Sequence, residues 1–260
     1  MAQATGAWDP GQYARFRDER AQPFYDLAAL VERRPGMRVL DLGCGGGELT
    51  AWLHRELQAA ATLGIDAAEP MLAQAWAHAG EGLRFEHADI AAFEPEWPAD
   101  LVFSNAALQW LEGHEALFGR IAGWVAPGGQ LAVQMPQNDD HPSHRVARAL
   151  AAEPLYREAL AGYERPFPVL APERYATLLH ELGFARQHVR LQVYAHLLPE
   201  TRALVEWVKG SLLTPYRERL PAEQYARFLA EYERRLMAQE SERAPYLYPF
   251  KRLLLWARRD

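Results

Sequence analysis

The chain has 260 residues, of which 49% are hydrophobic and 24% charged, so it can bury a sizeable core and is not extensively disordered. Its net charge of −6 argues against a general nucleic-acid or membrane-surface binder, because such proteins carry a basic face. The single cysteine, Cys44, excludes an intramolecular disulfide, and no signal peptide or long apolar run is recognisable. We therefore expect a cytoplasmic protein with no nucleic-acid or membrane partner.

Apolar strands alternate with amphipathic helices through the first half of the chain. A helix expected over residues 19–34 ends at Pro35-Gly36. The strands that follow are expected over residues 37–42, 62–65, 83–86, 101–104 and 130–135, and the helices over 48–57, 69–78 and 115–125. Strands separated by helices of this length predict βαβ units and a parallel sheet.

The alternation stops after Met135. We expect a loop over residues 136–170 that contains one helix, over 143–160, and then a helix over 173–182 and a strand over 184–197. Residues 199–244 carry apolar residues at helical spacing, and a last strand is expected over 246–257. The chain therefore predicts an α/β fold: a doubly wound, seven-stranded, mainly parallel sheet with helical insertions that cover the substrate pocket.

The most informative motif is the glycine-rich turn after the first strand, Gly43-Cys44-Gly45-Gly46-Gly47. Glycines at a strand-to-helix turn allow positive φ and let a ligand touch the backbone, and the following helix offers free N–H groups. Asp66, at the end of the second strand, is placed to accept both hydroxyls of a ribose. Together these residues predict a nucleoside-binding crevice at the carboxyl ends of parallel strands.

The residue two positions before the first glycine bears on which nucleoside is bound. A dinucleotide-binding turn has the pattern G-x-G-x-x-G, whereas here an acid, Asp41, precedes the glycines. A carboxylate there would repel a pyrophosphate but suit a cationic amino-acid group. The pattern favours S-adenosylmethionine over NAD, and a nicotinamide-dependent oxidoreductase remains an alternative.

Four segments carry a resemblance to class I S-adenosylmethionine-dependent methyltransferases: the glycine turn, Gly64-Ile65-Asp66, Glu69-Pro70-Met71-Leu72 and His87-Ala88-Asp89-Ile90. The resemblance implies that the glycine turn faces the methionine portion, Asp66 holds the ribose, Met71 packs near the adenine and Asp89 binds its amino group. The full set of implied cofactor contacts is Asp41, Gly43, Cys44, Gly45, Asp66, Ala67, Met71, Asp89, Ile90, Asn105 and Trp110. S-adenosylhomocysteine would be the product.

A narrower resemblance, to the trans-aconitate 2-methyltransferases, extends along most of the chain. It rests on Trp8-x-Pro10-x-x-Tyr13, on residues 104–111 (SNAALQWL) and on residues 131–136 (LAVQMP). It implies methylation of one carboxylate of a small polyanionic acid, giving a monomethyl ester. The chain departs from the family pattern in one place. The family has an arginine before a Pro-aromatic pair, whereas this chain has Thr214 before Pro215-Tyr216. Esterification of a malonyl-acyl-carrier thioester and a non-catalytic cofactor sensor remain alternatives.

A carboxylate acceptor changes what the site must contain. It is ionised at neutral pH, so no general base is needed and no catalytic side chain is expected. Cations and aromatic residues would bind it, with Arg20 and Lys209 preferred. The candidate acceptor-binding residues are Trp8, Tyr13, Arg20, Gln109, His144, Trp207, Lys209 and Tyr216.

Four side chains also allow a purely structural interpretation. Trp110 either makes a cation–π contact with the sulfonium or only fills core space. His141 and His144 lack the partners of a zinc site, so no metal is expected. A helix N-terminus would lower the pKa of Cys44, but no base is evident near it and a nucleophilic role is not expected.

The resemblance also suggests an organisation along the chain. We expect an N-terminal helical cover (1–35), an S-adenosylmethionine-binding core (36–135), a loop and helix cover (136–170), a return to the sheet (171–198), a helical insertion acting as the acceptor lid (199–245) and the last strand (246–260).

Overall fold

The computed structural model describes residues 17–260, and side chains from residue 21 onward. The described residues form two compact units. The sheet unit comprises Asp18–Gln137, Pro168–Gln192 and Lys251–Asp260, and the helical unit comprises Asn138–Phe167 and Val193–Phe250. The boundary falls inside strands β6 and β7, so each of these strands contributes residues to both units.

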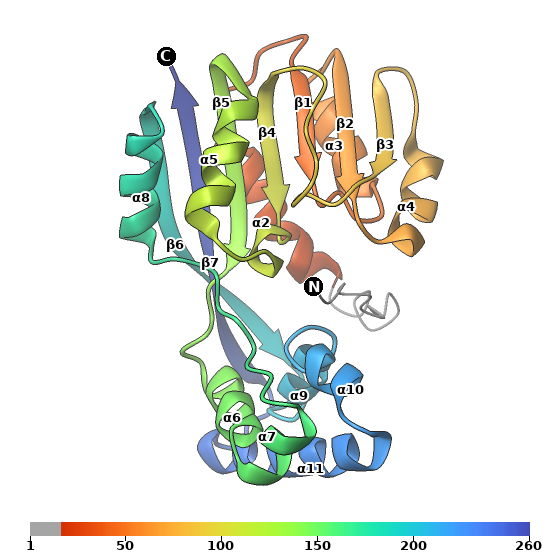
Figure 1. Ribbon diagram of the computed structural model, residues 1–260, viewed down its shortest axis with the longest axis vertical. Coiled ribbons are helices and arrows are strands. Elements are labelled where there is room, and N and C mark those ends of the chain that lie inside the picture. The colour runs from red at the N-terminus through yellow and green to blue at the C-terminus, as the bar shows by residue number, and fades with distance from the viewer. Residues whose placement is uncertain (1–16) are drawn as a thin grey trace. The chain divides into compact units, whose positions relative to one another are not determined.

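Seven strands form one sheet in the order β3-β2-β1-β4-β5-β7-β6 (Figure 1). Their bounds are β1 Arg38–Leu42, β2 Ala61–Asp66, β3 Leu83–His87, β4 Ala99–Asn105, β5 Val125–Pro136, β6 Phe184–Leu198 and β7 Tyr246–Arg259. The strands from β3 to β5 pair in parallel, and β7 runs antiparallel to β5. The predicted fold class is confirmed. Strand order reverses between β1 and β4, and ligands of such sheets bind at the carboxyl ends of strands at a reversal of this kind.

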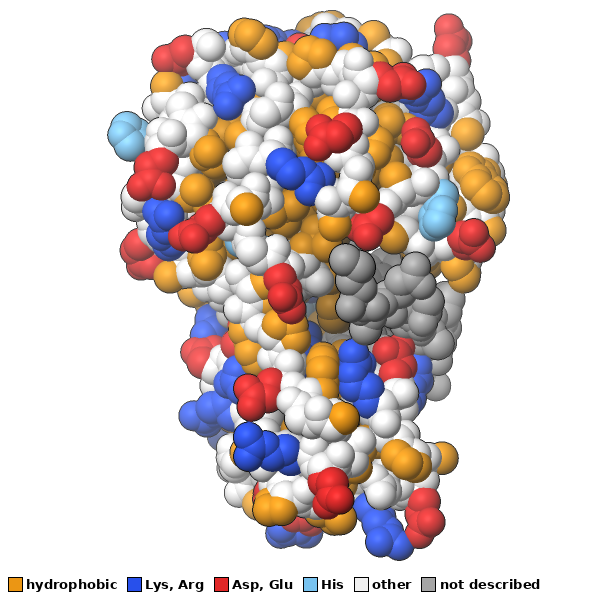
Figure 2. All heavy atoms as spheres, viewed as in Figure 1, with side chains coloured by type: hydrophobic (Ala, Val, Ile, Leu, Met, Phe, Trp, Pro, Cys, Tyr) orange, Lys and Arg blue, Asp and Glu red, His pale blue; other side chains and the backbone are white. Residues whose placement is uncertain are grey.

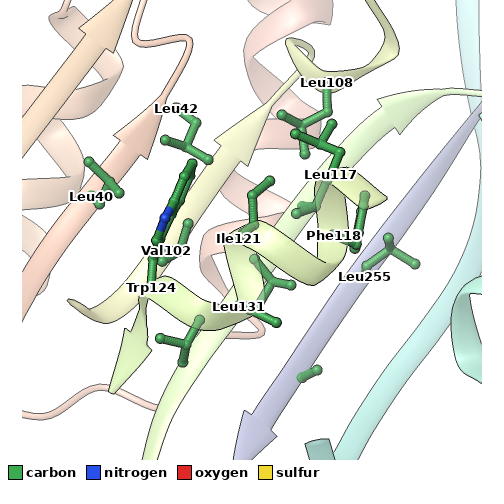
Figure 3. Packing of buried hydrophobic residues seen from close by; sticks show 14 of the residues in the cluster. Leu40, Leu42, Val102, Leu108, Leu117, Phe118, Ile121, Trp124, Leu131 and Leu255 are labelled. Carbon is green, nitrogen blue, oxygen red and sulfur yellow. The ribbon is translucent and has the colours of Figure 1, made fainter. Parts of the chain in front are cut away.

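Helices cover both faces of the sheet (Figure 1). In the sheet unit they are α2 Arg17–Ala28, α3 Glu48–Glu56, α4 Glu69–Ala75, α5 His114–Trp124 and α8 Pro172–Glu181, with short 3-10 turns η1 Trp76–His78 and η2 Leu108–Trp110. Helices α5 and α8 pack on one face, where Phe118 and Ile121 meet Leu42 and Leu131 (Figure 3). Helices α2 and α3 pack on the opposite face. Truncating a fully buried side chain such as Leu42 to alanine would cost about 2–5 kcal/mol, so these faces fix β1 firmly.

The helical unit has its own apolar core. Its helices are α6 Pro142–Ala151, α7 Pro154–Ala159, α9 Ala203–Lys209, α10 Thr214–Arg219 and α11 Ala222–Gln239, and buried side chains from all five meet in one cluster. The single helix expected over 143–160 is wrong, because α6 ends at Ala151 and α7 begins at Pro154. Glu153 is extended, at φ −68° and ψ 145°, as the residue before a proline prefers.

None of the helices that the structure describes between residues 17 and 260 has the length and apolar character needed to cross a bilayer. The role of an acceptor lid for residues 199–245 stays a prediction.

Candidate active site

The turn after β1 brings the glycine loop against the segment that follows β4. Gly43 has a φ of +79°, and a Cβ built on it would lie 2.3 Å from the Cβ of Ala107. That separation is far shorter than any van der Waals contact, so a side chain at position 43 would displace the β4 segment. Gly43 therefore keeps the loops after β1 and β4 in contact, at the point where the strand order reverses.

Asp66, the last residue of β2, is tied to the glycine loop through its side chain. Its Oδ2 accepts a hydrogen bond from the Gly45 N–H at 2.8 Å, and its Oδ1 accepts one from the Ala68 N–H at 2.9 Å. The Ile65 carbonyl oxygen accepts from the N–H groups of Gly43 and Cys44. Each carboxylate oxygen has a second lone pair, so Asp66 keeps acceptor capacity for two ligand hydroxyls.

Asp41 lies beneath the loop with its carboxylate almost fully buried. Its Oδ2 accepts a hydrogen bond from the Thr50 hydroxyl at 2.6 Å. Burial raises the pKa of Asp41 to about 7, and the negative charge of Asp66 adds to the rise while the Thr50 hydrogen bond opposes it. A cation bound at the loop would favour the ionised form. The sequence analysis missed Thr50, which could have been found as a hydroxyl one turn into the helix after the glycines.

The expected pKa of the Cys44 thiol is wrong in direction. Burial raises the pKa of Cys44, and the nearby charges of Asp41 and Asp66 raise it further. These effects outweigh any lowering from the N-terminus of α3. The thiol is therefore protonated and unreactive at neutral pH, in agreement with the expectation that it is no nucleophile.

Four predicted cofactor residues follow β2 and β3: Ala67 and Met71 after β2, the latter in α4, and Asp89 and Ile90 after β3. The Met71 Cε is 3.2 Å from the position of a Cβ built on Gly45, so this side chain packs on the glycine loop. Asp89 is exposed and its Oδ1 accepts a hydrogen bond from the Ala91 N–H at 2.8 Å, whereas Ile90 is buried. Ala67, also expected at the cofactor, is exposed.

The segment after β4 carries two buried oxygens without a donor. Neither Asn105 Oδ1 nor Gln109 Oε1 has a hydrogen-bond partner in the described part of the chain, although the Gln109 amide donates to the Ala106 carbonyl at 2.7 Å. Buried acceptors normally have partners, so these two oxygens fit a ligand with N–H or O–H donors. The ammonium group of S-adenosylmethionine is such a donor, and the residues present fit this cofactor.

Trp110 does not fill core space. It lies in η2 and is 52% exposed, so the core-packing alternative for this side chain is wrong. An exposed indole next to buried acceptor oxygens remains consistent with contact to a bound cation.

A separate hollow of about 370 Å³ lies beside β3. It is lined by Leu63 and Phe93 together with Glu86 and Asp89. Figure 2 shows hydrophobic side chains exposed between acidic ones on this face of the sheet unit. No residue of the glycine loop lines the hollow, but it shares Asp89 with the predicted adenine side of the cofactor site.

Of the predicted acceptor-binding residues, four lie in the helical unit. Trp207 is 4% exposed and its ring packs 4.7 Å from that of His196, and Tyr216 is 1% exposed and stacks on Phe228 at 5.1 Å. The ammonium of Lys209 pairs with the Glu206 carboxylate.

His144, the fourth of these residues, was expected to be a cation. That expectation is wrong, because burial and the neighbouring positive charges of Arg165, His141 and Arg148 lower its pKa to about 3. At neutral pH His144 is an uncharged imidazole, able to donate a hydrogen bond but not to supply charge.

Of the other four predicted acceptor residues, Gln109 follows β4 as described above, and three receive little or no structural test. Trp8 and Tyr13 lie outside the described residues, and Arg20 lies in α2 but its side chain is not described. Between residues 17 and 260 the structure holds no group of three or more side chains able to ligate a metal ion.

Known proteins resemble this chain over nearly its whole length. Residues 39–129 match the family model described as a methyltransferase domain. A trans-aconitate 2-methyltransferase of Deinococcus radiodurans is 43% identical, covering 97% of this chain and 98% of the relative, and one of Methylobacterium nodulans is 44% identical with the same coverages. The chain belongs to the trans-aconitate 2-methyltransferase family.

A solved structure adds to this assignment. An S-adenosylmethionine-dependent methyltransferase from Mesorhizobium loti matches this family member with a TM-score of 0.53 at 25% identity, covering 90% of this chain and 96% of that one. The protein is an S-adenosylmethionine-dependent methyltransferase, as the sequence resemblance implied, and the nicotinamide-dependent alternative is not supported.

The sequence analysis did not consider two cations of this methyltransferase. Arg148 lies on α6, four residues after His144, and Arg165 lies in the loop after α7. The signals that could have found them are the helical spacing from His144 and the run Arg165-Pro166-Phe167-Pro168, which places a guanidinium beside an aromatic ring.

Proposed function

We propose that the protein transfers a methyl group from S-adenosylmethionine to a carboxylate oxygen of trans-aconitate, giving a monomethyl ester. The observation that carries this proposal is the identity of 43% and 44% to trans-aconitate 2-methyltransferases over 97% of the chain. The similarity is not confined to the cofactor-binding motifs, and it includes the helical unit where acceptor residues are expected.

S-adenosylmethionine supplies an electrophilic methyl group on a sulfonium. The contacts described above suggest how this chain holds it. Asp66 accepts the ribose hydroxyls, while Asp41 and the unpartnered Asn105 oxygen favour the cationic methionine end. Met71, whose side chain packs against the glycine loop, borders the adenine. Asp89 binds the adenine amino group.

The side chains need not move a proton. The acceptor carboxylate is already ionised at neutral pH and is the nucleophile itself. Residues of the chain therefore contribute by holding the acceptor in line with the donor and by excluding water, and such positioning can supply about 7–11 kcal/mol of the barrier reduction. The Cys44 thiol is protonated at neutral pH because burial raises its pKa, so it would not act as the nucleophile.

A methyl-transfer assay with a panel of acids tests the proposal. Full-length protein is incubated with methyl-labelled S-adenosylmethionine and, separately, trans-aconitate, dicarboxylates, monocarboxylates and a malonyl thioester. We expect label in a product of trans-aconitate that mild base releases as methanol, since methyl esters are base-labile. Label only in base-stable products, or only with the malonyl thioester, would contradict the proposal.

Three narrower expectations remain predictions from composition. They are a cytoplasmic location, the absence of a nucleic-acid partner and the absence of a membrane partner.

A further inference from the structure

A buried histidine at the start of α5 joins helix α8 to the turn η2. The Nε2 of His114 lies 3.0 Å from the carbonyl oxygen of Leu108, the first residue of η2. Its Nδ1 is hydrogen-bonded to the hydroxyl of Tyr175 on α8. All three residues belong to the sheet unit, which also holds the glycine turn.

The partners of His114 determine which ring nitrogen carries the proton. A carbonyl oxygen only accepts, so Nε2 donates to Leu108. Burial lowers the pKa of His114, and hydrogen bonds to the backbone at Leu108 and Leu111 oppose this shift only in part, so the ring is uncharged at neutral pH. Nδ1 therefore accepts from the Tyr175 hydroxyl, which in turn accepts from the Leu170 N–H at 3.2 Å. Because each group in this chain of hydrogen bonds has one role, the imidazole has one tautomer and one orientation.

Apolar packing supports the same arrangement. The ring centroid of Phe118 lies 5.9 Å from that of His114 and 5.0 Å from that of Tyr175. Leu108 is fully buried in the cluster that contains Phe118 (Figure 3). A 3-10 turn has poorer hydrogen-bond geometry than an α-helix, so the three-residue η2 depends on such tertiary contacts. The bond from Nε2 is directional and fixes the plane of the peptide that joins Leu108 to Gln109.

That peptide leads to a side chain whose oxygen is available to a ligand. The Gln109 amide nitrogen donates to the Ala106 carbonyl at 2.7 Å, and its Oε1 is buried with no hydrogen-bond partner among the residues that the structure describes. Ala106 has a φ of +55°, and its N–H donates to the Gln134 carbonyl on β5 at 2.9 Å, so it is itself anchored to the sheet. The next residue, Ala107, faces Gly43 of the glycine turn. Gln109 is thus held on the segment that contacts this turn.

We infer that His114 is a positioning residue of this methyltransferase: by holding the Leu108 carbonyl, it sets Gln109 so that Oε1 accepts a hydrogen bond from the ammonium group of the bound cofactor. The inference rests on the proposed placement of S-adenosylmethionine against the segment after β4, and it does not depend on which acid is the acceptor. His114 acts through Gln109 and moves no proton. Tyr175 contributes by fixing the tautomer that donates to Leu108.

Two amide substitutions separate the two sides of the His114 ring. A glutamine amide reaches about as far as Nε2 and an asparagine amide about as far as Nδ1, so only His114→Gln keeps a donor to Leu108. Calorimetry on the full-length protein should give an affinity for S-adenosylhomocysteine within about threefold of wild type for His114→Gln, and at least about tenfold weaker for His114→Asn. Tyr175→Phe should fall between them. His54→Gln is the matched control, at a half-buried histidine of α3 that is hydrogen-bonded to Thr62, and should leave the affinity unchanged.

A double-mutant cycle tests whether His114 acts through Gln109. Gln109→Ala should weaken S-adenosylhomocysteine binding about as much as His114→Asn, and the double variant should lose little more, because both changes remove the same contact. If His114→Asn does not fold, Tyr175→Phe takes its place in the cycle. A merely structural histidine would instead give additive losses, or equal losses in the Gln and Asn variants, and either result would overturn the inference.

The same measurements separate this inference from the proposed function. An unchanged affinity in Gln109→Ala would overturn the positioning role, while turnover of trans-aconitate by the wild type would leave the function standing. Conversely, a wild-type protein that binds S-adenosylhomocysteine with the predicted variant pattern but does not methylate trans-aconitate would support the role of His114 and reject the function.

Discussion

The Oδ2 of Asp66 accepts a hydrogen bond from the backbone N–H of Gly45 at 2.8 Å. One residue ends β2 and the other lies in the turn after β1, so this bond closes the crevice at the ends of two neighbouring strands. The carboxylate expected to hold the ribose thus also orders the glycine loop expected to face the methionine portion. Loss of Asp66 should therefore affect both ends of the cofactor.

Asp66→Ala should weaken S-adenosylhomocysteine binding at least tenfold, about 1.4 kcal/mol, because the ribose loses an acceptor and the loop loses its tie. Asp66→Asn should have a smaller effect, since one oxygen remains. Isothermal titration calorimetry measures both, with Glu69→Gln at an exposed neighbouring position as control. An affinity for Asp66→Ala equal to that of wild type would show that the ribose assignment is wrong.

Gly43→Ala should destabilise the fold by about 1–3 kcal/mol, because the new methyl group meets Ala107. Gly36→Ala is a close control: Gly36 has a similar φ, +77°, but a Cβ there would have no neighbour within 4 Å. Denaturant unfolding of both variants separates the clash from the backbone strain. The double variant Gly43→Ala/Ala107→Gly should recover part of the difference, and equal losses in the two single variants would contradict the contact.

Cofactor affinity should depend on pH through Asp41. The pKa of Asp41 is about 7 in the folded protein and 3.8 ordinarily. The folded protein therefore loses stability through this group as pH rises from 3.8 to about 7. A cationic cofactor favours the ionised carboxylate, so binding should tighten between about pH 6 and about pH 7.5. Asp41→Asn should flatten this dependence and Thr50→Val should move it to higher pH, because the Thr50 hydrogen bond lowers the pKa. Calorimetric titrations across that range would contradict the assignment if the wild-type affinity were constant.

Cys44 should resist alkylation in the native protein. Its thiol is buried and its pKa is raised, so little thiolate is present at pH 8. The rate of reaction with an aromatic disulfide reagent should be at least about tenfold lower than in denaturant. Reaction at the rate of the unfolded chain would mean that the glycine loop opens readily.

Sequence reasoning predicted that the glycine turn and Asp66 lie together, as the structure shows, because their signals are local. Strand, glycine turn and helix follow one another within residues 37–57, and Asp66 ends the next strand, so their proximity follows from parallel pairing alone. It failed where a local rule was overlooked, at Pro154, which divides the helix expected over 143–160. It also failed for the Cys44 pKa, because burial among carboxylates is a tertiary effect.

Contacts within the helical unit were harder to predict because tertiary packing brings their residues together. Arg148 and Arg165 are separated by α7 and meet only at the ring of Phe167. Conversely, the structure pairs Lys209 with Glu206, three residues earlier on α9, and this i,i+3 spacing in a predicted helix was overlooked. Charge count alone therefore does not show which cations are paired with carboxylates and which share a ring.

A crystal structure of the protein with S-adenosylhomocysteine tests the central claim most directly. The account predicts the ribose hydroxyls on the Asp66 carboxylate, the amino-acid end against the Gly43–Gly45 turn and the adenine beside Asp89. Nucleoside density at any other place, or a turn closed by protein side chains at saturating ligand, would contradict it.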